Sequence, residues 1–325
     1  MAVLDMRDVS LTYHPAEGPV PAVRGVNLSV NAGEVVGVAG ESGCGKSTLI
    51  STVLRLYPKS ATVEGEVLVD GENVFEMKWN RMRAVRWGEA AVVFQGALHS
   101  LNPIQRIGKQ LSEPILVHDK NATEASAMKK VRELLEQVGL PARHANAYPH
   151  QLSGGQKQRI MIALALTCDP KVLLCDEPTT ALDVMVQAQI LDLLKGIARE
   201  RSMGMLIISH DLSVLSSNCD RIAIMYAGQV VEQGPALDLF QHPAHPYTRA
   251  LMGAFPTIGD NESRYAPSGL PGDPPFPGDL PSGCAFHPRC PIATEECKSV
   301  DVELESIAPG RDVACIHVNQ GVSAS

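Results

Sequence analysis

Two short glycine-containing motifs in this chain have the residue types that hold phosphate groups. The first is GESGCGKST, from Gly40 to Thr48, which fits the phosphate-loop pattern G-x-x-x-x-G-K-[ST]. Its glycines lack a Cβ atom, so backbone N–H groups can close around phosphate oxygens. Lys46 is suited to reach the β- and γ-phosphates, and the Ser47 hydroxyl is suited to bind Mg²⁺. The motif therefore predicts a nucleoside triphosphatase.

The second motif is LSGGQ, from Leu152 to Gln156. Ser153 and two glycines precede a helix-like run that extends to Thr167. The exposed N–H groups at a helix N-terminus attract anions, which favours a phosphate contact. A serine at this position is also an ordinary N-cap residue, so the motif by itself fits both interpretations.

Candidate catalytic residues follow two apolar runs. Residues 172–175 predict a buried parallel strand that delivers Asp176 and Glu177 at its end. Asp176 is suited to bind Mg²⁺ through a water molecule, and Glu177 is suited to act as general base on the attacking water. A second apolar run, residues 204–209, ends at His210. Acidic strand ends and single histidines are often structural, so these residues gain weight from their order behind the phosphate loop.

The phosphate loop and LSGGQ together resemble the motifs of the ABC transporter ATPases, in which LSGGQ is the signature. The resemblance implies that Ser153, Gly154 and Gly155 bind the γ-phosphate held by the phosphate loop of a second subunit. The sequence PTTALD, at residues 178–183, is similar to the family's D-loop. His210 corresponds to the switch histidine, which contacts the γ-phosphate.

Two more positions are implied by the resemblance. The sequence VVFQ is similar to the Q-loop, in which Gln95 would bind Mg²⁺ or the attacking water and act as a hinge. Tyr13 corresponds to the aromatic residue that stacks on adenine, although a tyrosine in a strand often serves packing alone. The complete set expected to bind ATP and Mg²⁺ is Tyr13, Gly40, Ser42, Gly43, Gly45, Lys46, Ser47, Thr48, Gln95, Ser153, Gly154, Gly155, Gln156, Asp176 and Asp183. The expected catalytic residues are Glu177, His210 and Gln95, and the expected Mg²⁺ ligands are Ser47, Gln95 and Asp176.

Composition limits the classes of function. The 325 residues are 45% hydrophobic, which is sufficient for a globular core and about two domains. No apolar run approaches the roughly 18 residues that cross a bilayer, and the N-terminal MAVLDMRD lacks the features of a signal peptide. The net charge of −8 argues against broad binding to nucleic acid or to anionic lipid. We therefore expect a cytoplasmic chain that reaches a membrane through partner proteins.

The order of the motifs predicts the fold. Residues 1–39 predict a small antiparallel sheet, and residues 96–166 predict a helical insertion between the phosphate loop and the carboxylates. The fold class expected from the resemblance is α/β, a RecA-like core with an antiparallel β subdomain and an inserted helical subdomain. We expect an ATP-binding domain over residues 1–258. Residues 259–325 are expected to form a Pro/Gly-rich linker and a cysteine-rich C-terminal module.

The expected C-terminal module contains half of the eight cysteines of the chain: Cys284, Cys290, Cys297 and Cys315. Stable disulfides are unusual in a cytoplasmic protein, so four grouped thiols suggest a metal site. Their spacing lacks the C-x₂₋₄-C pair that is typical of zinc sites, whereas iron–sulfur clusters accept several spacings. A [4Fe–4S] cluster, a zinc ion and reduced thiols that simply pack remain open at this point. The module lies outside every sequence motif that touches ATP.

Further motifs resemble one branch of the ABC family, the dipeptide/oligopeptide importers. HPYTRAL (245–251), LPGDPP (270–275), GCAFHPRCP (283–291) and SLNP (100–103) are similar to their ATPase subunits over essentially the whole chain. Some members carry a [4Fe–4S] cluster on the four cysteines. The sequence GALH at residues 96–99 departs from the acidic residue and proline common in this branch, which bears on the choice of permease.

The resemblance implies an ATPase subunit on the cytoplasmic face of the membrane that powers peptide import. Its partners would be a second, non-identical ATPase chain, two permease subunits and an extracytoplasmic solute-binding protein. A nickel or oligosaccharide importer of the same branch is an alternative. So is a soluble ABC ATPase acting on nucleic acid or ribosomes, although the single ATPase half and the negative charge oppose it. The intact catalytic positions oppose a third interpretation, an inactive nucleotide sensor.

Overall fold

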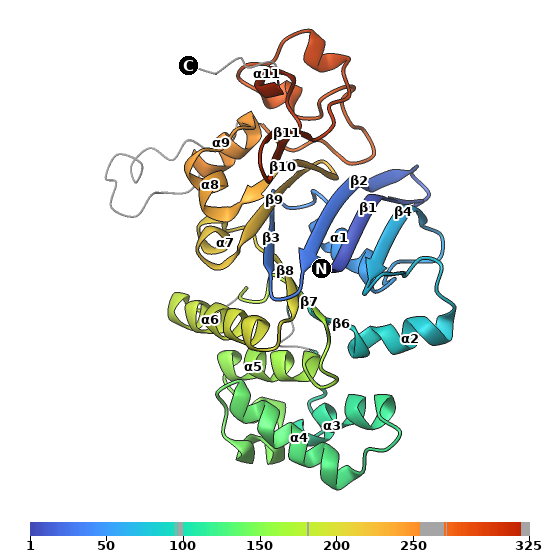
Figure 1. The fold of residues 1–325 in the computed structure, drawn as a ribbon, viewed down its shortest axis with the longest axis vertical. Helices are drawn as coiled ribbons and strands as arrows, with labels where there is room; N and C mark the ends of the chain where they lie inside the picture. Colours follow the sequence, from blue (N-terminus) through green and yellow to red (C-terminus); the bar gives the residue numbers. More distant parts are fainter. Residues whose placement is uncertain (95, 97–99, 181, 254–269, 271, 320–325) are drawn as a thin grey trace.

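The computed structural model describes residues 1–94, 96, 100–180, 182–253, 270 and 272–319. Within these residues, two β-sheets are packed among helices, and the arrangement is the expected α/β fold (Figure 1). A helical lobe lies at one end of the molecule and the C-terminal segment at the other. Gln95, residues 97–99, Ala181, residues 254–269, Pro271 and residues 320–325 lie outside the described residues, and they include part of the expected linker.

The first sheet is antiparallel, with strand order β2-β1-β4-β5. In the first strand Leu4 and Met6, and then Val9 and Leu11, are buried, as a two-residue period predicts for a sheet with one covered face, and an irregularity between Met6 and Val9 shifts the period by one residue. Residues 35–39, which we had grouped with this sheet, instead belong to the second one, and two later strands complete the first. The strands are β1 (Ala2–Tyr13), β2 (Val20–Asn31), β4 (Thr62–Val69) and β5 (Glu72–Asn73).

The second sheet carries the phosphate loop and has the order β11-β12-β10-β9-β3-β8-β7-β6. The five strands in the order β9-β3-β8-β7-β6 are parallel to one another, whereas β9 and β10 form an antiparallel hairpin. Its strands in the core are β3 (Val35–Ala39), β6 (Ala90–Val93), β7 (Val172–Asp176), β8 (Gly204–Ile208), β9 (Arg221–Tyr226) and β10 (Gln229–Pro235).

Both faces of this sheet are covered, which explains the unbroken apolar runs of its strands. In β3, Val36 and Val38 pack into the core beneath the antiparallel sheet, whereas Val35 and Ala39 face the core formed with the other helices. The helices around the two sheets are α1 (Lys46–Val53), α2 (Trp79–Gly88), α6 (Val184–Glu200), α7 (Leu212–Asn218), α8 (Ala236–Gln241) and α9 (Pro246–Gly253).

The helical lobe is inserted between β6 and β7 (Figure 1). It consists of α3 (Ile107–His118), α4 (Glu124–Gln137) and α5 (Gly154–Ala165), with two short 3₁₀ turns between α4 and α5. The apolar residues of α4 recur at helical spacing and are buried in the lobe, and they include Val131 and Leu135. The lobe connects directly to the two strands that lead to the candidate catalytic residues.

The C-terminal segment continues the second sheet. Strand β12 (Arg311–Val313) pairs with β10, and β11 (Glu305–Ala308) pairs with β12. The cysteines lie around two 3₁₀ turns, at His287–Arg289 and Glu296–Lys298, and just before the short helix α11 (Ile316–Asn319). This segment is therefore joined to the ATPase core by backbone hydrogen bonds as well as by side chains.

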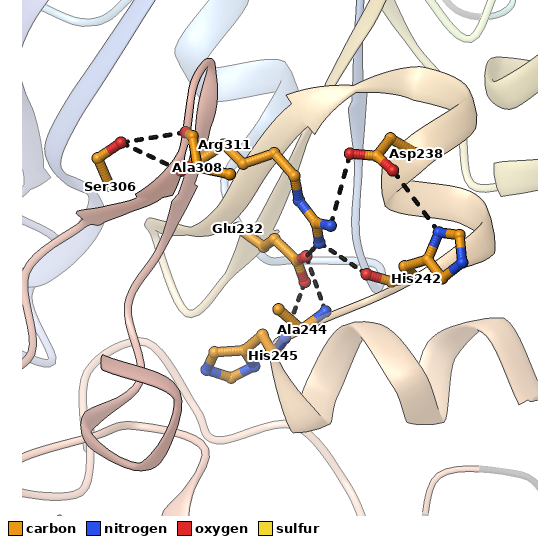
Figure 2. A network of polar contacts seen from close by, with 8 residues as sticks. All are labelled: Glu232, Asp238, His242, Ala244, His245, Ser306, Ala308 and Arg311. Carbon is orange, nitrogen blue, oxygen red and sulfur yellow. Dashed lines mark hydrogen bonds and ion pairs between the residues drawn. The ribbon is translucent and has the colours of Figure 1, made fainter. Parts of the chain in front are cut away.

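A buried ion pair fixes this junction (Figure 2). The Glu232 side chain is fully buried, and it accepts hydrogen bonds from the backbone N–H groups of Ala244 and His245, at 2.9 Å each. Arg311 donates to Glu232 at 3.0 Å and to the His242 carbonyl at 2.6 Å. Charges buried with several hydrogen-bond partners are costly to separate, so the network holds β12 and the start of α9 in one arrangement.

His245 extends the same junction toward the aromatic residues beneath the C-terminal segment. Burial lowers the pKa of His245 to about 4, which keeps its imidazole neutral. Its Nδ1 atom accepts a hydrogen bond of 3.0 Å from the backbone of Tyr247. The rings of Tyr226, Tyr247 and Phe286 meet with centroid separations of 4.6–5.4 Å. The HPYTRAL motif therefore positions Tyr247 in a cluster between the core and the C-terminal segment.

Candidate functional site

The phosphate loop connects β3 to α1 in a conformation that its glycines permit. Gly40 has a φ of +154° and Gly45 a φ of +104°, values that residues with a side chain rarely adopt. A Cβ atom at Gly40 would collide with the carbonyl oxygen of Met225, and one at Gly45 with that of Ala22. The two glycines are therefore required both by backbone conformation and by close packing, as a phosphate loop demands.

Lys46 is buried against this loop. Its ammonium group donates to the carbonyl oxygens of Gly40 and Glu41, at 2.7 and 2.8 Å. The charge is held at the start of α1, where the exposed N–H groups of the helix also favour an anion. Lysine and helix terminus together form a site for phosphate oxygens.

Ser47 and Asp176 are 129 positions apart in the chain but lie next to each other in the fold. The Ser47 hydroxyl donates to Oδ1 of Asp176 at 3.1 Å, because β3 and β7 lie on either side of β8 with their carboxyl ends at one edge. Burial raises the pKa of Asp176, and the Ser47 hydroxyl partly opposes that effect. Mg²⁺ prefers oxygen ligands of this kind, so the pair fits the expected cation, with Gln95 outside the described residues.

Glu177 and His210 also meet at this edge. The backbone of Glu177 adopts a positive φ of +45°, which is uncommon for a side-chain-bearing residue and frequent at functional sites. Oε1 of Glu177 lies 3.5 Å from Nδ1 of His210, and Oε2 accepts a hydrogen bond of 2.9 Å from Thr180. Glu177 is largely covered, whereas His210 is 65% exposed. The carboxylate is therefore oriented by its neighbours while the imidazole faces solvent.

The LSGGQ motif begins α5. Ser153 is the N-cap: its hydroxyl accepts from the N–H of Gln156 at 3.3 Å, and the Gln156 side chain accepts from the N–H of Ser153 at 3.0 Å. The helix-capping interpretation is therefore realised in this structure. Ser153 is nevertheless exposed, and Figure 1 draws α5 in a different lobe from α1. The signature thus presents its helix N-terminus at a surface.

The D-loop lies close to the signature. Asp183 is the N-cap of α6, where its Oδ1 accepts from the N–H of Val186 at 3.0 Å. A Cβ atom at Gly155 would lie only 2.9 Å from a methyl group of Val186, so the second glycine of the signature allows α5 and α6 to approach. Val184 and Met185, which sequence reasoning missed, are 79% and 71% exposed at the same place. Two apolar residues directly after a D-loop were the available signal.

Tyr13 ends β1 near the first turn of α1. Its hydroxyl lies 3.5 Å from that of Thr48, within the phosphate-loop motif. This contact places the Tyr13 hydroxyl beside the phosphate-loop motif, and the stacking of its ring on adenine stays a prediction. The described part of the predicted ATP set therefore falls into two groups, one around the phosphate loop and one at the starts of α5 and α6.

The four C-terminal cysteines line one small cavity together with three histidines. None of the four is in a disulfide, and Cys297 Sγ lies 3.4 Å from Nε2 of His317. Burial raises the pKa of Cys290 to about 11 and also raises that of Cys284, so both are neutral thiols here. Among the described residues, no three His, Cys, Asp or Glu side chains are close enough to hold a metal ion. The fold therefore brings the four thiols to one cavity, but not close enough together to hold a single metal ion.

The cysteine segment touches the phosphate loop, although it lies outside the ATP-binding motifs in the sequence. The guanidinium of Arg289, adjacent to Cys290, donates to both carboxylate oxygens of Glu41 at 2.7 and 3.0 Å. Glu41 is a variable position of the phosphate-loop pattern, so its role gave no signal in the motif.

Family models match two parts of the chain. Residues 23–180 match the model described as "ABC transporter", and residues 231–297 match "Oligopeptide/dipeptide transporter, C-terminal region". The chain is 42% identical to the probable peptide ABC transporter ATP-binding protein y4tR of Sinorhizobium fredii, over 99% of this chain and 96% of that protein. It is 40% identical to the oligopeptide transport ATP-binding protein OppD of Escherichia coli, over 97% and 93%.

Solved structures with a similar fold are ATP-binding cassettes. The dimeric bacterial ABC transporter cassette MJ0796 covers 72% of this chain and 98% of its own, with a TM-score of 0.64 and 31% identity. CbiO1 of Clostridium perfringens, part of the ABC transporter complex cbiONQ, covers 74% and 91%, with a TM-score of 0.65 and 28% identity. The matched share leaves about a quarter of this chain beyond the cassette common to them.

Proposed function

Because the chain belongs to the ATP-binding subunits of dipeptide/oligopeptide ABC transporters, we propose that it hydrolyses ATP to power peptide import as one half of an ATPase dimer. The observation that carries this proposal is the convergence of Lys46, Ser47, Asp176, Glu177 and His210 at one edge of the second sheet. A cation-binding pair and an oriented carboxylate beside a phosphate loop are the components of nucleoside triphosphate hydrolysis.

The residues of this edge take distinct roles in the proposed reaction. Ser47 and Asp176 would hold Mg²⁺, which supplies positive charge to the phosphate oxygens. Lys46 would exchange its loop carbonyls for the β- and γ-phosphate oxygens. Glu177 would accept a proton from the attacking water, and its bond from Thr180 orients it for that step. His210 would contact the γ-phosphate from the solvent side.

The LSGGQ signature of this chain would complete the ATP site of a partner ATPase subunit. Ser153, Gly154 and Gly155 would contact the γ-phosphate held by the partner's phosphate loop, and the exposed N-terminus of α5 supports this assignment. The exposed Val184 and Met185 would be covered in the same interface. We propose that the partner is a different chain, as in the heterodimers expected from the resemblance.

The helical side of the molecule would meet the membrane-embedded partners. No helix within the described ranges is long and apolar enough to span a bilayer. Phe94 is 45% exposed and Ile104 is 82% exposed. They flank residues 95–103, the stretch that we propose as the contact with a permease. We propose that two permease subunits dock here, with an extracytoplasmic solute-binding protein on the other side, and that the chain lies on the cytoplasmic face. A disulfide formed between Ser100→Cys and a permease loop, but not from Ser306→Cys, would support this placement.

We further propose that Cys284, Cys290, Cys297 and Cys315 hold a [4Fe–4S] cluster. Their common cavity supports it, because thiolates are the ligands of such clusters. Burial raises the pKa of Cys284 and Cys290 and so favours their neutral thiols. Binding of a cluster would oppose this effect, because the ligands bind as thiolates.

Hydrolysis by the assembled transporter tests the main proposal. The chain alone should hydrolyse ATP slowly, and its specific activity should rise with concentration, because the signature and the phosphate loop act on different nucleotides. The complex with both permeases and the partner ATPase should be fast. Full activity of a chain shown to be monomeric by light scattering would contradict the two-subunit mechanism.

A further inference from the structure

Glu41 belongs to the phosphate loop, so its carboxylate carries a negative charge close to the expected site of a polyanion. It belongs to the segment between Gly40 and Lys46 that encloses the phosphate groups. A negative charge this close to a nucleoside triphosphate repels it, and the repulsion is strong where water is partly excluded. The side chain of Glu41 is 22% exposed, so solvent screens only part of the effect.

Arg289 neutralises this charge from the C-terminal segment. Two parallel N–H···O bonds of 2.7 and 3.0 Å join its guanidinium to the Glu41 carboxylate, across 248 residues of sequence. Arg289 is only 6% exposed, and it also donates to the Tyr226 hydroxyl at 3.3 Å. Such a bidentate pair fixes direction as well as charge. The pair raises the pKa of Arg289 further above its already high usual value, so the charge is permanent.

All polar groups of Glu41 are engaged at once. Its N–H donates to the Tyr247 hydroxyl at 2.9 Å, and its carbonyl accepts from Lys46 at 2.8 Å. The residue therefore connects the C-terminal segment directly to the ammonium group that reaches phosphate. A displacement of the Glu41 side chain moves a backbone group on which Lys46 depends.

We propose that Arg289 is a positioning residue of the phosphate loop, which by neutralising Glu41 makes the affinity for ATP depend on the C-terminal segment. The proposal rests on the ATP-binding function described above and adds a regulatory input to it. Any event that moves the turn at His287–Arg289, next to Cys290, changes the charge that the nucleotide encounters.

Nucleotide affinities of the purified full-length chain test this dependence. Arg289→Met should weaken ATP binding by about tenfold, within the range typical of coupling between neighbouring sites. The loss should decrease from ATP to ADP and vanish for adenosine, because it follows the phosphate charge. Glu41→Gln keeps a hydrogen-bond acceptor and removes the charge, so it should bind ATP at least as tightly as the unmodified chain. The double variant should recover most of the affinity lost in Arg289→Met.

The possible outcomes distinguish failure of the Arg289 proposal from failure of the proposed ATP-binding function. Arg143→Met, an exposed arginine of the helical lobe, is the matched control and should bind all nucleotides unchanged. If Arg289→Met binds ATP normally, or if Glu41→Gln weakens ATP binding, the proposal is wrong. The second criterion holds even if Arg289→Met fails to fold. If the unmodified chain itself does not bind ATP, the proposed function fails instead.

Discussion

The Oε1 atom of Glu177 lies 3.5 Å from Nδ1 of His210, although 33 positions separate the two residues in the chain. Strands β7 and β8 are parallel neighbours, with Asp176 opposite Ile208, so Glu177, directly after β7, and His210, two residues after the end of β8, reach the same edge. The other carboxylate oxygen of Glu177 is held by Thr180. The carboxylate that we propose as the base is therefore held on one side by Thr180 and meets a solvent-exposed imidazole on the other.

Replacing Glu177 by glutamine should separate ATP binding from hydrolysis. The amide keeps the shape and the hydrogen bond from Thr180 but cannot take a proton, so turnover should fall on the order of 10²–10⁴-fold. ATP should bind as before, and the ATP-bound dimer should accumulate on size-exclusion chromatography. Glu200→Gln, at the exposed end of α6, is the control and should hydrolyse normally. Near-normal hydrolysis by Glu177→Gln would show that another group is the base.

Replacing Lys46 by alanine should act on binding instead. The variant loses hydrogen bonds to charged oxygens, each worth about 1.5–3 kcal/mol, so the dissociation constant for ATP should rise by roughly 10- to 100-fold. Titration with a fluorescent ATP analogue measures the change. Lys129→Ala, whose side chain is 81% exposed on α4, should not alter it. Unchanged affinity in Lys46→Ala would place the phosphates elsewhere.

Anaerobically purified chain should be brown and contain about four iron atoms. Cys290→Ser should remove the colour, since it deletes one thiolate ligand, whereas Cys168→Ser, far in sequence from the four C-terminal cysteines, should keep it. Metal analysis by mass spectrometry decides between the alternatives. About one zinc per chain without iron would favour a zinc site, and absence of any metal would leave packed thiols.

The junction around His245 should make stability depend on pH. The folded chain holds this histidine neutral down to about pH 4, whereas the unfolded chain protonates it near pH 6.5. Between these values the unfolded state binds more protons, so the free energy of unfolding falls as the pH is lowered, by at most about 3 kcal/mol. His245→Asn, which keeps a hydrogen-bond acceptor, should lose much of this dependence in urea unfolding at pH 7.5 and 5.0.

His14→Asn provides the comparison for that measurement, because His14 is exposed. It should show the same difference between the two pH values as the unmodified chain. An equal difference in His245→Asn would assign the acid sensitivity to other groups.

Motif order was sufficient to predict which residues meet at this edge of the sheet. Lys46 and Ser47 are the first two residues of α1, Asp176 is the last residue of β7 and Glu177 follows it, and parallel strands bring such positions to one edge. The contact between Glu41 and Arg289 could not be predicted in this way. Neither residue lies in a periodic pattern, and their meeting depends on how the C-terminal turns pack against Tyr226. The pairing of β12 with β10 likewise depends on long-range register, which local sequence does not encode.

The place of β12 in the second sheet has a consequence for biosynthesis. During translation the chain emerges from its N-terminus, so β10 is available long before residues 311–313 leave the ribosome. Until then β10 has an open edge, and the carboxylate of Glu232 lacks its arginine. A chain that stops before Arg311 would therefore expose a strand ready to pair with another molecule.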